Sequence, residues 1–192
     1  RSCFDSIPVQ LAKENKKFQY KVVKKGGTAG IFGESLEWLL FAGLIHKCNK
    51  IDNGFMPIAA YVDASDFKVY MGDVGLLTLK SGMAPQIVLS LEEPDNRFMG
   101  GLAENYVAAS LAARGHKLFY WKNENTAEVD FVIQIQDKII PVEVKKGTHS
   151  GSTSLKIFRN RYECEFSYRI SLKNFGKGEG VVCIPHYAIF CI

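Results

Sequence analysis

Two adjacent apolar segments in the second half of the chain constrain its fold more than any other feature. Residues 128–135 and 138–144 are rich in Val, Ile and Phe, and only Gln136 and Asp137 separate them. Runs of this length and composition predict two β-strands joined by a two-residue hairpin turn. Because both runs are apolar on both faces, they are typical of central strands in a covered sheet. The sequence therefore predicts an α/β fold built around this hairpin.

The predicted hairpin brings three charged side chains to one face. With a two-residue turn, Ile135 pairs with Lys138, and the same register places Asp130 directly opposite Glu143. Paired positions have Cβ atoms about 4.5–5.5 Å apart, so both carboxylates leave the sheet at one point. Lys145 lies two residues beyond Glu143 and emerges on the same side. A turn longer by two residues would keep that shared face, whereas a three-residue turn would not.

Two facing carboxylates repel each other unless a positive charge lies between them. A shared proton, the ammonium group of Lys145 or a divalent metal ion could supply that charge. A cluster of oxygen ligands with room for water favours Mg²⁺ over Zn²⁺. Lys145 could then orient an attacking water or stabilise an oxyanion that develops on a phosphate. The alternative is an exposed strand face with an ordinary ion pair, and the apolar neighbours argue against it.

A largely apolar helix is predicted ahead of the hairpin, at residues 98–114, and Gly115 ends it. Apart from the last residue, its only ionisable side chains are those of Glu104 and Tyr106. A carboxylate buried in such a helix is costly unless it is paired, neutralised or bound to a metal. Glu104 is therefore either a buried ligand or a side chain that reaches the helix edge or caps a neighbouring turn. The helix alone favours the second interpretation.

The first half of the chain has the order of elements of a winged helix-turn-helix. Helical patterns begin near Pro8 and from Glu34, and Gly43 is expected to end the second one. Strand patterns follow at 45–50, 58–62 and 67–71, with a turn expected at 63–66. Folds of this type often place the second helix in a DNA groove, but others connect proteins, so the pattern alone does not decide between the two.

Residues 81–97 carry the weakest pattern, and we expect the domain boundary there. This gives a winged helix-turn-helix region at 1–90 and a second domain at 91–192. The net charge of +4 permits a phosphate-bearing partner without requiring one. Four lysines of the first region are candidate contacts to nucleic acid, or else simply keep the surface soluble: Lys24, Lys25, Lys47 and Lys50.

The composition, with 47% hydrophobic and 23% charged residues, is that of a soluble globular protein. The longest apolar runs are too short to span a bilayer, and no signal peptide is evident. Five scattered cysteines without a CxxC pair argue against a zinc site or a disulfide framework and predict reduced thiols in the cytoplasm. Since patterned sequence starts within a few residues of Arg1, we expect a fragment of a longer polypeptide.

The ordered series of motifs resembles the PD-(D/E)xK nuclease superfamily. The motifs are Glu104 in an apolar helix, the pair Tyr120–Trp121, and the segments 128–133 and 141–145. More narrowly, the chain is similar to the C-terminal region of prokaryotic AAA-type ATPases, in which a winged helix precedes a nuclease-like domain of uncharacterised function. That narrower resemblance rests on the segments 7–18, 35–40, 42–44, 73–77 and 184–189.

The resemblance implies a restriction-endonuclease-like mixed sheet flanked by helices, with a four-residue site. Asp130 and Glu143 would hold Mg²⁺ or Mn²⁺, Glu104 would bind it directly or through water, and Lys145 would serve the nucleophile or the transition state. The resemblance also implies an ATPase domain upstream in the same polypeptide, because this chain lacks the Gly-x4-Gly-Lys-Ser/Thr phosphate-binding loop.

Three functions remain open from the sequence. The leading hypothesis is metal-dependent hydrolysis of a nucleic-acid phosphodiester, with DNA as the expected partner and the winged helix helping to hold the duplex. The second is a non-catalytic regulatory module that binds DNA or a protein partner of the ATPase. The third is a domain that serves only oligomerisation or docking, which would not bind DNA even at low salt.

Overall fold

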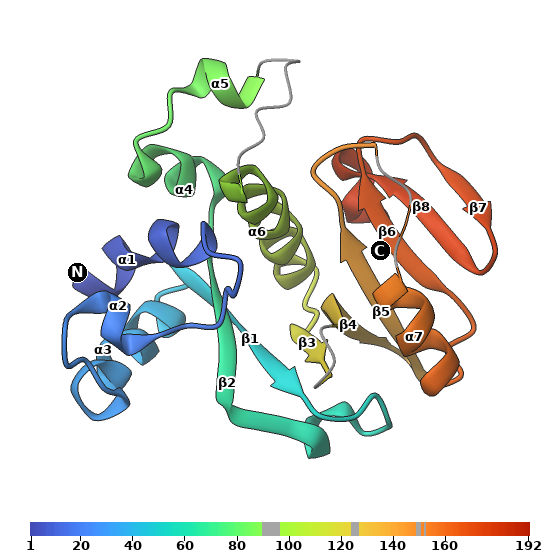
Figure 1. Ribbon diagram of the computed structural model, residues 1–192, viewed down its shortest axis with the longest axis horizontal. Helices are drawn as coiled ribbons and strands as arrows, with labels where there is room; N and C mark the ends of the chain where they lie inside the picture. Colours follow the sequence, from blue (N-terminus) through green and yellow to red (C-terminus); the bar gives the residue numbers. More distant parts are fainter. Residues whose placement is uncertain (90–96, 124–126, 149–150, 152) are drawn as a thin grey trace. The chain divides into compact units, whose positions relative to one another are not determined.

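The computed structural model describes residues 1–89, 97–123, 127–148, 151 and 153–192 (Figure 1). The chain divides into two compact units, each made of two segments. The first unit comprises Arg1–Lys47 and Lys68–Ala109, and the second comprises Cys48–Phe67 and Ser110–Ile192. The domain boundary expected between residues 90 and 91 lies outside the described residues.

The first unit is mainly helical. Its helices are α1 (Ser2–Leu11), α2 (Tyr20–Val23), α3 (Ala29–Phe41), α4 (Val74–Ser81), α5 (Pro85–Leu89) and most of α6 (Arg97–Ala113). Two predicted helix ends are confirmed: Gly43 and Gly115 follow α3 and α6 with φ of 69° and 85°, a conformation that costs glycine little. Helix α3 begins at Ala29, ahead of the expected start, because Gly30 and Gly33 weaken the helical pattern there.

The prediction that the first helix starts near Pro8 is wrong. Helix α1 begins at Ser2, and Pro8 lies inside it. Cys3, Ile7 and Leu11 recur at helical spacing and are fully buried on one face. Burial of this apolar face therefore outweighs the backbone hydrogen bond that a proline inside a helix removes.

The second unit contains most of a mixed eight-stranded sheet. The strands are β1 (Ile45–Ile51), β2 (Val62–Met71), β3 (Phe119–Lys122), β4 (Glu128–Ile135), β5 (Lys138–Val144), β6 (Ser167–Ser171), β7 (Gly176–Gly178) and β8 (Val181–Pro185). Their order is β2-β1-β3-β4-β5-β6-β8-β7. Strand β1 pairs parallel with β3, β4 lies antiparallel between β3 and β5, and β5, β6 and β8 are parallel. The predicted hairpin is confirmed with the expected bounds of both strands.

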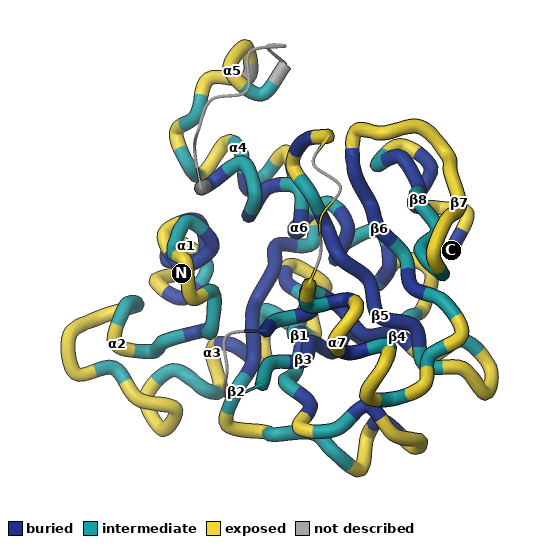
Figure 2. Tube along the Cα trace, turned by 45° about the vertical axis from the view of Figure 1, so that its right-hand side comes forward, coloured by how far each residue is buried: buried dark blue, intermediate teal, exposed yellow. Residues whose placement is uncertain are grey.

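Helix α7 (Thr153–Arg161) lies against β4 and β5 (Figure 1). Its Leu155 and Phe158 join a buried cluster with Trp121, Val129 and Val132. The buried stretches follow the central strands β5 and β6 (Figure 2). The hairpin is thus held in a covered part of the sheet, as its composition predicts.

Residues 58–66 do not follow the prediction of a strand and a turn. Ile58–Tyr61 is a 3-10 helix, and residues 63–66 lie inside β2. The Asp and Ser residues indicate a turn by composition, but Asp63 accepts hydrogen bonds from the backbone N–H and the hydroxyl of Ser65 within extended backbone, and neighbouring strands supply further partners. Lys50 lies 3.6 Å from Asp63, and the Tyr120 hydroxyl donates to Asp66.

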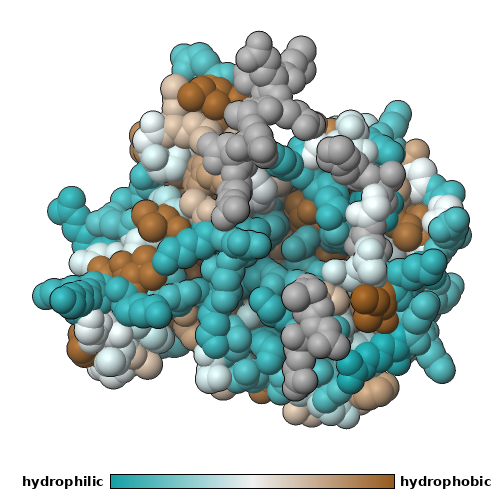
Figure 3. All heavy atoms as spheres, viewed as in Figure 1, coloured by the Kyte–Doolittle hydropathy of each residue, from teal (hydrophilic) through white to brown (hydrophobic). Residues whose placement is uncertain are grey.

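An α/β architecture with a mixed sheet and flanking helices is therefore confirmed, while the winged-helix and restriction-endonuclease-like identities stay predictions. Strands β1 and β2 are neighbours, as the ribbon of a winged helix requires, but β1 also pairs with β3 and so continues into the larger sheet. On the face shown in Figure 3, hydrophilic side chains prevail and hydrophobic ones form separate patches. Among the residues that the structure describes, every helix is too short or too polar to cross a bilayer.

Candidate functional site

The β4–β5 hairpin places the first candidate pair. The ladder follows the predicted register as far as Phe131 and Val142, and the next residues along the two strands are Asp130 and Glu143. Asp130 Oδ2 accepts a hydrogen bond of 2.8 Å from the backbone N–H of Val144. This bond fixes the Asp130 carboxylate against the neighbouring strand, at the level where Glu143 emerges.

Glu143 is a buried carboxylate with an incomplete set of partners. Its side chain is 9% exposed, and Oε1 forms an ion pair with the partly exposed ammonium group of Lys145. Oε2 is buried and has no hydrogen-bond partner among the described residues. Leaving a buried acceptor unpaired costs about 1–3 kcal/mol, and more for a charged group. Oε2 is therefore a buried acceptor atom without a partner among the described residues, one residue along the hairpin from the end of the printed ladder.

Arg169 lies next to Glu143 and was not predicted as a site residue. Strand β6 pairs with β5 so that Arg169 and Glu143 are register partners. Arg169 is 9% exposed, and its Nε atom is buried without a partner. The signal available in the sequence was an arginine between Tyr168 and Ile170 in a predicted strand.

Glu104 belongs to the first unit, whereas Asp130, Glu143 and Lys145 belong to the second. Glu104 is 5% exposed, so the alternative that it reaches solvent at the helix edge is wrong. Oε1 lies 2.5 Å from Nζ of Lys16, and Oε2 accepts a hydrogen bond of 3.2 Å from the Tyr70 hydroxyl. Both oxygens are thus engaged within the first unit.

Further contacts of the first unit hold α6 in place around Glu104. The buried amide of Asn105 accepts from the backbone N–H of Met71 at 2.7 Å and donates to its carbonyl at 3.0 Å. A Cβ on Gly101 would lie 2.6 Å from the carbonyl oxygen of Leu11, so α6 and α1 touch through their backbones. Neither Asn105 nor Lys16 was predicted, because both act on residues far away in the sequence.

The carboxylates of the second unit fit a hard cation such as Mg²⁺. Proteins often hold Mg²⁺ by one or two carboxylates while water and phosphate oxygens complete the octahedral shell. Asp130 and Glu143 offer such a pair, and the unpartnered Oε2 is the atom that a cation would satisfy. Across the described parts of the chain, no group of three or more His, Cys, Asp or Glu residues could hold a metal ion. Water or substrate would therefore complete the coordination.

The lysines predicted to contact nucleic acid have different surroundings: Lys24, Lys25, Lys47 and Lys50. The first two are exposed in the turn between α2 and α3, and Lys47 is half-buried in β1. Lys50 lies 2.9 Å from Asp52 and 3.6 Å from Asp63. The hydrogen bond to Asp52 raises the pKa of Lys50. Two carboxylates already neutralise Lys50, so it is the least suited of the four to bind phosphate.

Helix α3 carries an exposed apolar surface, which we call the α3 face: Ile31, Glu34, Glu37, Trp38 and Phe41. Trp38 is 65% exposed and Phe41 is 88% exposed, and with both glutamates they line a shallow hollow. The helix contains no Lys or Arg. This surface combines apolar area with negative charge.

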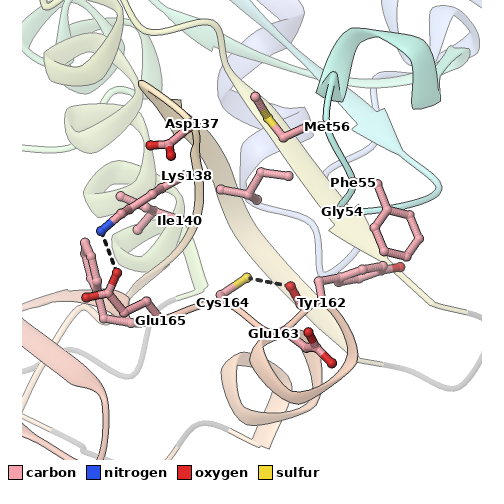
Figure 4. Close-up of a pocket in the computed structure, with 12 residues that line it drawn as sticks. Gly54, Phe55, Met56, Asp137, Lys138, Ile140, Tyr162, Glu163, Cys164 and Glu165 are labelled. Atoms are coloured by element: carbon pink, nitrogen blue, oxygen red, sulfur yellow. Dashed lines mark hydrogen bonds and ion pairs between the residues drawn. The ribbon is translucent and has the colours of Figure 1, made fainter.

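A cavity of about 370 Å³ lies at the turn end of the hairpin (Figure 4). It is lined by residues 54–56, 137–140 and 162–166, and the ion pair of Lys138 and Glu165 lies on its wall. Burial raises the pKa of the Cys164 thiol to about 11, so this thiol is protonated at neutral pH and is a poor nucleophile. Asp130 and Glu143 lie at the other end of the hairpin, away from the cavity.

Comparison with known families divides the chain in two. Residues 99–189 match the family described as "Domain of unknown function (DUF4143)", which is often found at the C-termini of AAA-type ATPases. Residues 1–87 match the family described as "Domain of unknown function (DUF8612)". No curated protein and no solved structure matches the chain significantly.

Proposed function

We propose that the second unit carries a metal-dependent nuclease site in which Asp130 and Glu143 bind Mg²⁺ or Mn²⁺ and Lys145 assists hydrolysis of a phosphodiester. The observation that supports this most directly is the buried, unpartnered Oε2 of Glu143. An ionised carboxylate oxygen without a partner is costly, and a cation would remove that cost. Asp130, which is fixed by the N–H of Val144, supplies the second oxygen ligand.

Each residue of this site has a distinct task. A bound divalent ion supplies Lewis acidity and lowers the pKa of a coordinated water. Asp130 and Glu143 orient their oxygens from adjacent strands, so little rearrangement is needed for binding. Lys145 pairs with Glu143 and reaches solvent with part of its side chain. When a cation neutralises Glu143, the ammonium group can turn to the negative charge of a phosphate.

Glu104 has a secondary place in this proposal. Lys16 and Tyr70 already engage both of its oxygens. A role as metal ligand would require it to exchange one of these partners, so the proposed site depends on the hairpin residues first. We further propose that this domain is restriction-endonuclease-like, that it follows a winged helix and an ATPase domain in the same polypeptide, and that its substrate is DNA.

A plasmid-nicking assay with Mg²⁺ or Mn²⁺ tests the proposal. We expect the wild-type chain to nick, and we expect Asp130→Asn and Lys145→Met to lose this activity. Lys138→Met is the matched control, because Lys138 lies at the opposite end of β5 and pairs with Glu165 near the turn. The proposal fails if wild type does not nick with either metal, or if Lys145→Met nicks as fast as wild type.

The α3 face supports a second candidate function, that of a protein-binding module. In the winged helix-turn-helix predicted from the sequence, α3 corresponds to the second helix of the motif. In members that bind DNA, this helix enters the groove. Here that helix has no cation, and Glu34 and Glu37 would repel phosphates. Exposed Trp38 and Phe41 between two glutamates suit instead an amphipathic helix of a protein partner that carries Lys or Arg beside its apolar residues.

Tryptophan fluorescence can test this second function. Of the two tryptophans in the chain, Trp121 is buried and Trp38 is exposed, so a change in exposure reports on the α3 face. A synthetic Leu/Lys amphipathic helix should shift the emission to the blue, whereas a Leu/Glu helix should not. Charge reversal with Glu34→Lys and Glu37→Lys should exchange these preferences. An equal response to both peptides, or none, would exclude the proposed partner chemistry.

A further inference from the structure

Arg169 is a buried arginine for which the described residues provide no partner. It lies in the middle of β6, in the sequence Ser-Tyr-Arg-Ile-Ser, and is 9% exposed. Its Nε is buried without a hydrogen-bond partner, and no described residue forms a hydrogen bond or ion pair with its guanidinium group. Arg159 of the same unit also has a buried Nε without a partner, but its Nη1 donates to the carbonyl of Glu179 at 2.7 Å.

This position is energetically unusual. A guanidinium group remains protonated at any ordinary pH and carries five N–H donors. Burying most of such a side chain, with Nε left without a hydrogen-bond partner, is costly. An anion that binds the guanidinium would satisfy its donors and compensate its charge.

The neighbours of Arg169 define where that anion would lie. Arg169 is the register partner of Glu143 in a parallel ladder, so both side chains project from the same face of the sheet. The nearest carboxylate is nevertheless not its partner, because Glu143 Oε1 pairs with Lys145 and Oε2 has no partner. One face therefore carries two cations, Lys145 and Arg169, beside two carboxylates, Asp130 and Glu143.

A divalent cation held by Asp130 and Glu143 would neutralise their negative charge. The two cationic side chains would then remain for an anionic ligand. A phosphate group matches the planar, forked donors of a guanidinium, which bind two oxygens at once. We propose that Arg169 binds the phosphodiester group of a nucleic acid at this site and positions it beside Lys145. This role presupposes the nuclease proposed above and adds a substrate-binding residue to it.

Binding without turnover tests this role separately from catalysis. The probe is a fluorescently labelled oligonucleotide, and its anisotropy is titrated with the full chain in Ca²⁺ buffer at several salt concentrations. We expect Arg169→Met to lower the affinity roughly tenfold to a hundredfold, the range for losing a hydrogen bond to a charged group. The slope of log affinity against log salt should fall by about one for one lost phosphate contact.

Two further variants separate binding from folding. Arg169→Lys retains the charge and should retain the slope of log affinity against log salt. It loses the paired N–H donors that bind two phosphate oxygens, so it should bind more weakly than wild type. Arg161→Met is the control, because Arg161 is an exposed arginine of the same unit and its loss should change neither quantity. Thermal unfolding of every variant shows whether the fold is retained.

The outcomes distinguish this inference from the nuclease proposal. If Arg169→Met and Arg169→Lys bind the oligonucleotide as wild type does while their unfolding temperatures fall, Arg169 is a structural partner of Glu143 and the inference is overturned. Plasmid nicking by wild type would still support the nuclease in that case. If Arg169→Met loses binding and wild type never nicks, the phosphate site stands and the nuclease proposal fails.

Discussion

Loss of the Lys16 ammonium group should destabilise the first unit strongly. Lys16→Met keeps most of the side-chain volume but removes the charge 2.5 Å from Glu104 Oε1. The Glu104 side chain is 7% exposed, so its carboxylate would remain buried with the Tyr70 hydroxyl as its partner among the described residues. Removing one partner of a buried ion pair costs about 3–5 kcal/mol. Because the Lys16 side chain is 18% exposed and water can enter, we expect about 2–4 kcal/mol.

Urea unfolding followed by circular dichroism measures this free energy in a double-mutant cycle. The cycle consists of wild type, Lys16→Met, Glu104→Gln and the double variant. Glu104→Gln removes the buried charge, so in the Lys16→Met background it should recover about 1–2 kcal/mol. The exposed lysine Lys21 supplies the control, and Lys21→Met should change stability by less than about 0.5 kcal/mol.

Two results would refute this reasoning. A cost below about 1 kcal/mol for Lys16→Met would be that of an exposed ion pair and would mean that the contact with Glu104 contributes little. A double variant less stable than Lys16→Met alone would mean that Glu104 has another partner in solution. Either result would mean that the ion pair with Lys16 does not account for the burial of the Glu104 carboxylate.

Three other properties follow from the described contacts. Gly101→Ala should lower the free energy of unfolding by about 1–3 kcal/mol in urea titrations, because its Cβ would lie 2.6 Å from the Leu11 carbonyl oxygen. With its pKa raised by burial to about 11, the Cys164 thiol should react slowly with iodoacetamide at pH 7 compared with exposed Cys191, and its rate should rise steadily up to about pH 11 as thiolate forms. Lys138→Met breaks an exposed ion pair and should shift thermal unfolding by no more than about 4 °C.

The hairpin could be predicted from sequence because its determinants are local. Turn length sets the register, and apolar composition sets the burial, so the ladder that ends at Phe131 and Val142, next to Asp130 and Glu143, follows from a short stretch of chain. Local composition failed at residues 63–66, where Asp and Ser indicate a turn. There Asp63 accepts hydrogen bonds from Ser65 within the strand, and Lys50 and Tyr120, which lie elsewhere in the chain, pair with Asp63 and Asp66.

The partners of the charged residues could not be predicted in this way. Lys16 meets Glu104 across 88 residues of sequence, and Tyr70 meets it across 34. Arg169 becomes a neighbour of Glu143 only because β6 pairs with β5 in one particular parallel register. Sequence spacing carries no information about such contacts, since they depend on how separate elements pack.

The two buried glutamates differ in a way that ranks the candidate site residues. The family resemblance treats Glu104 and Glu143 as members of one metal site, yet their surroundings are unequal. Glu104 has a partner for each oxygen, so its burial is already compensated and requires no ligand. Among the described residues, Glu143 has one oxygen without a partner, and it lies next to Arg169, whose Nε also has none. Uncompensated charge is what a ligand would stabilise, so the case for a metal and a phosphate rests on the hairpin and on β6 before it rests on α6.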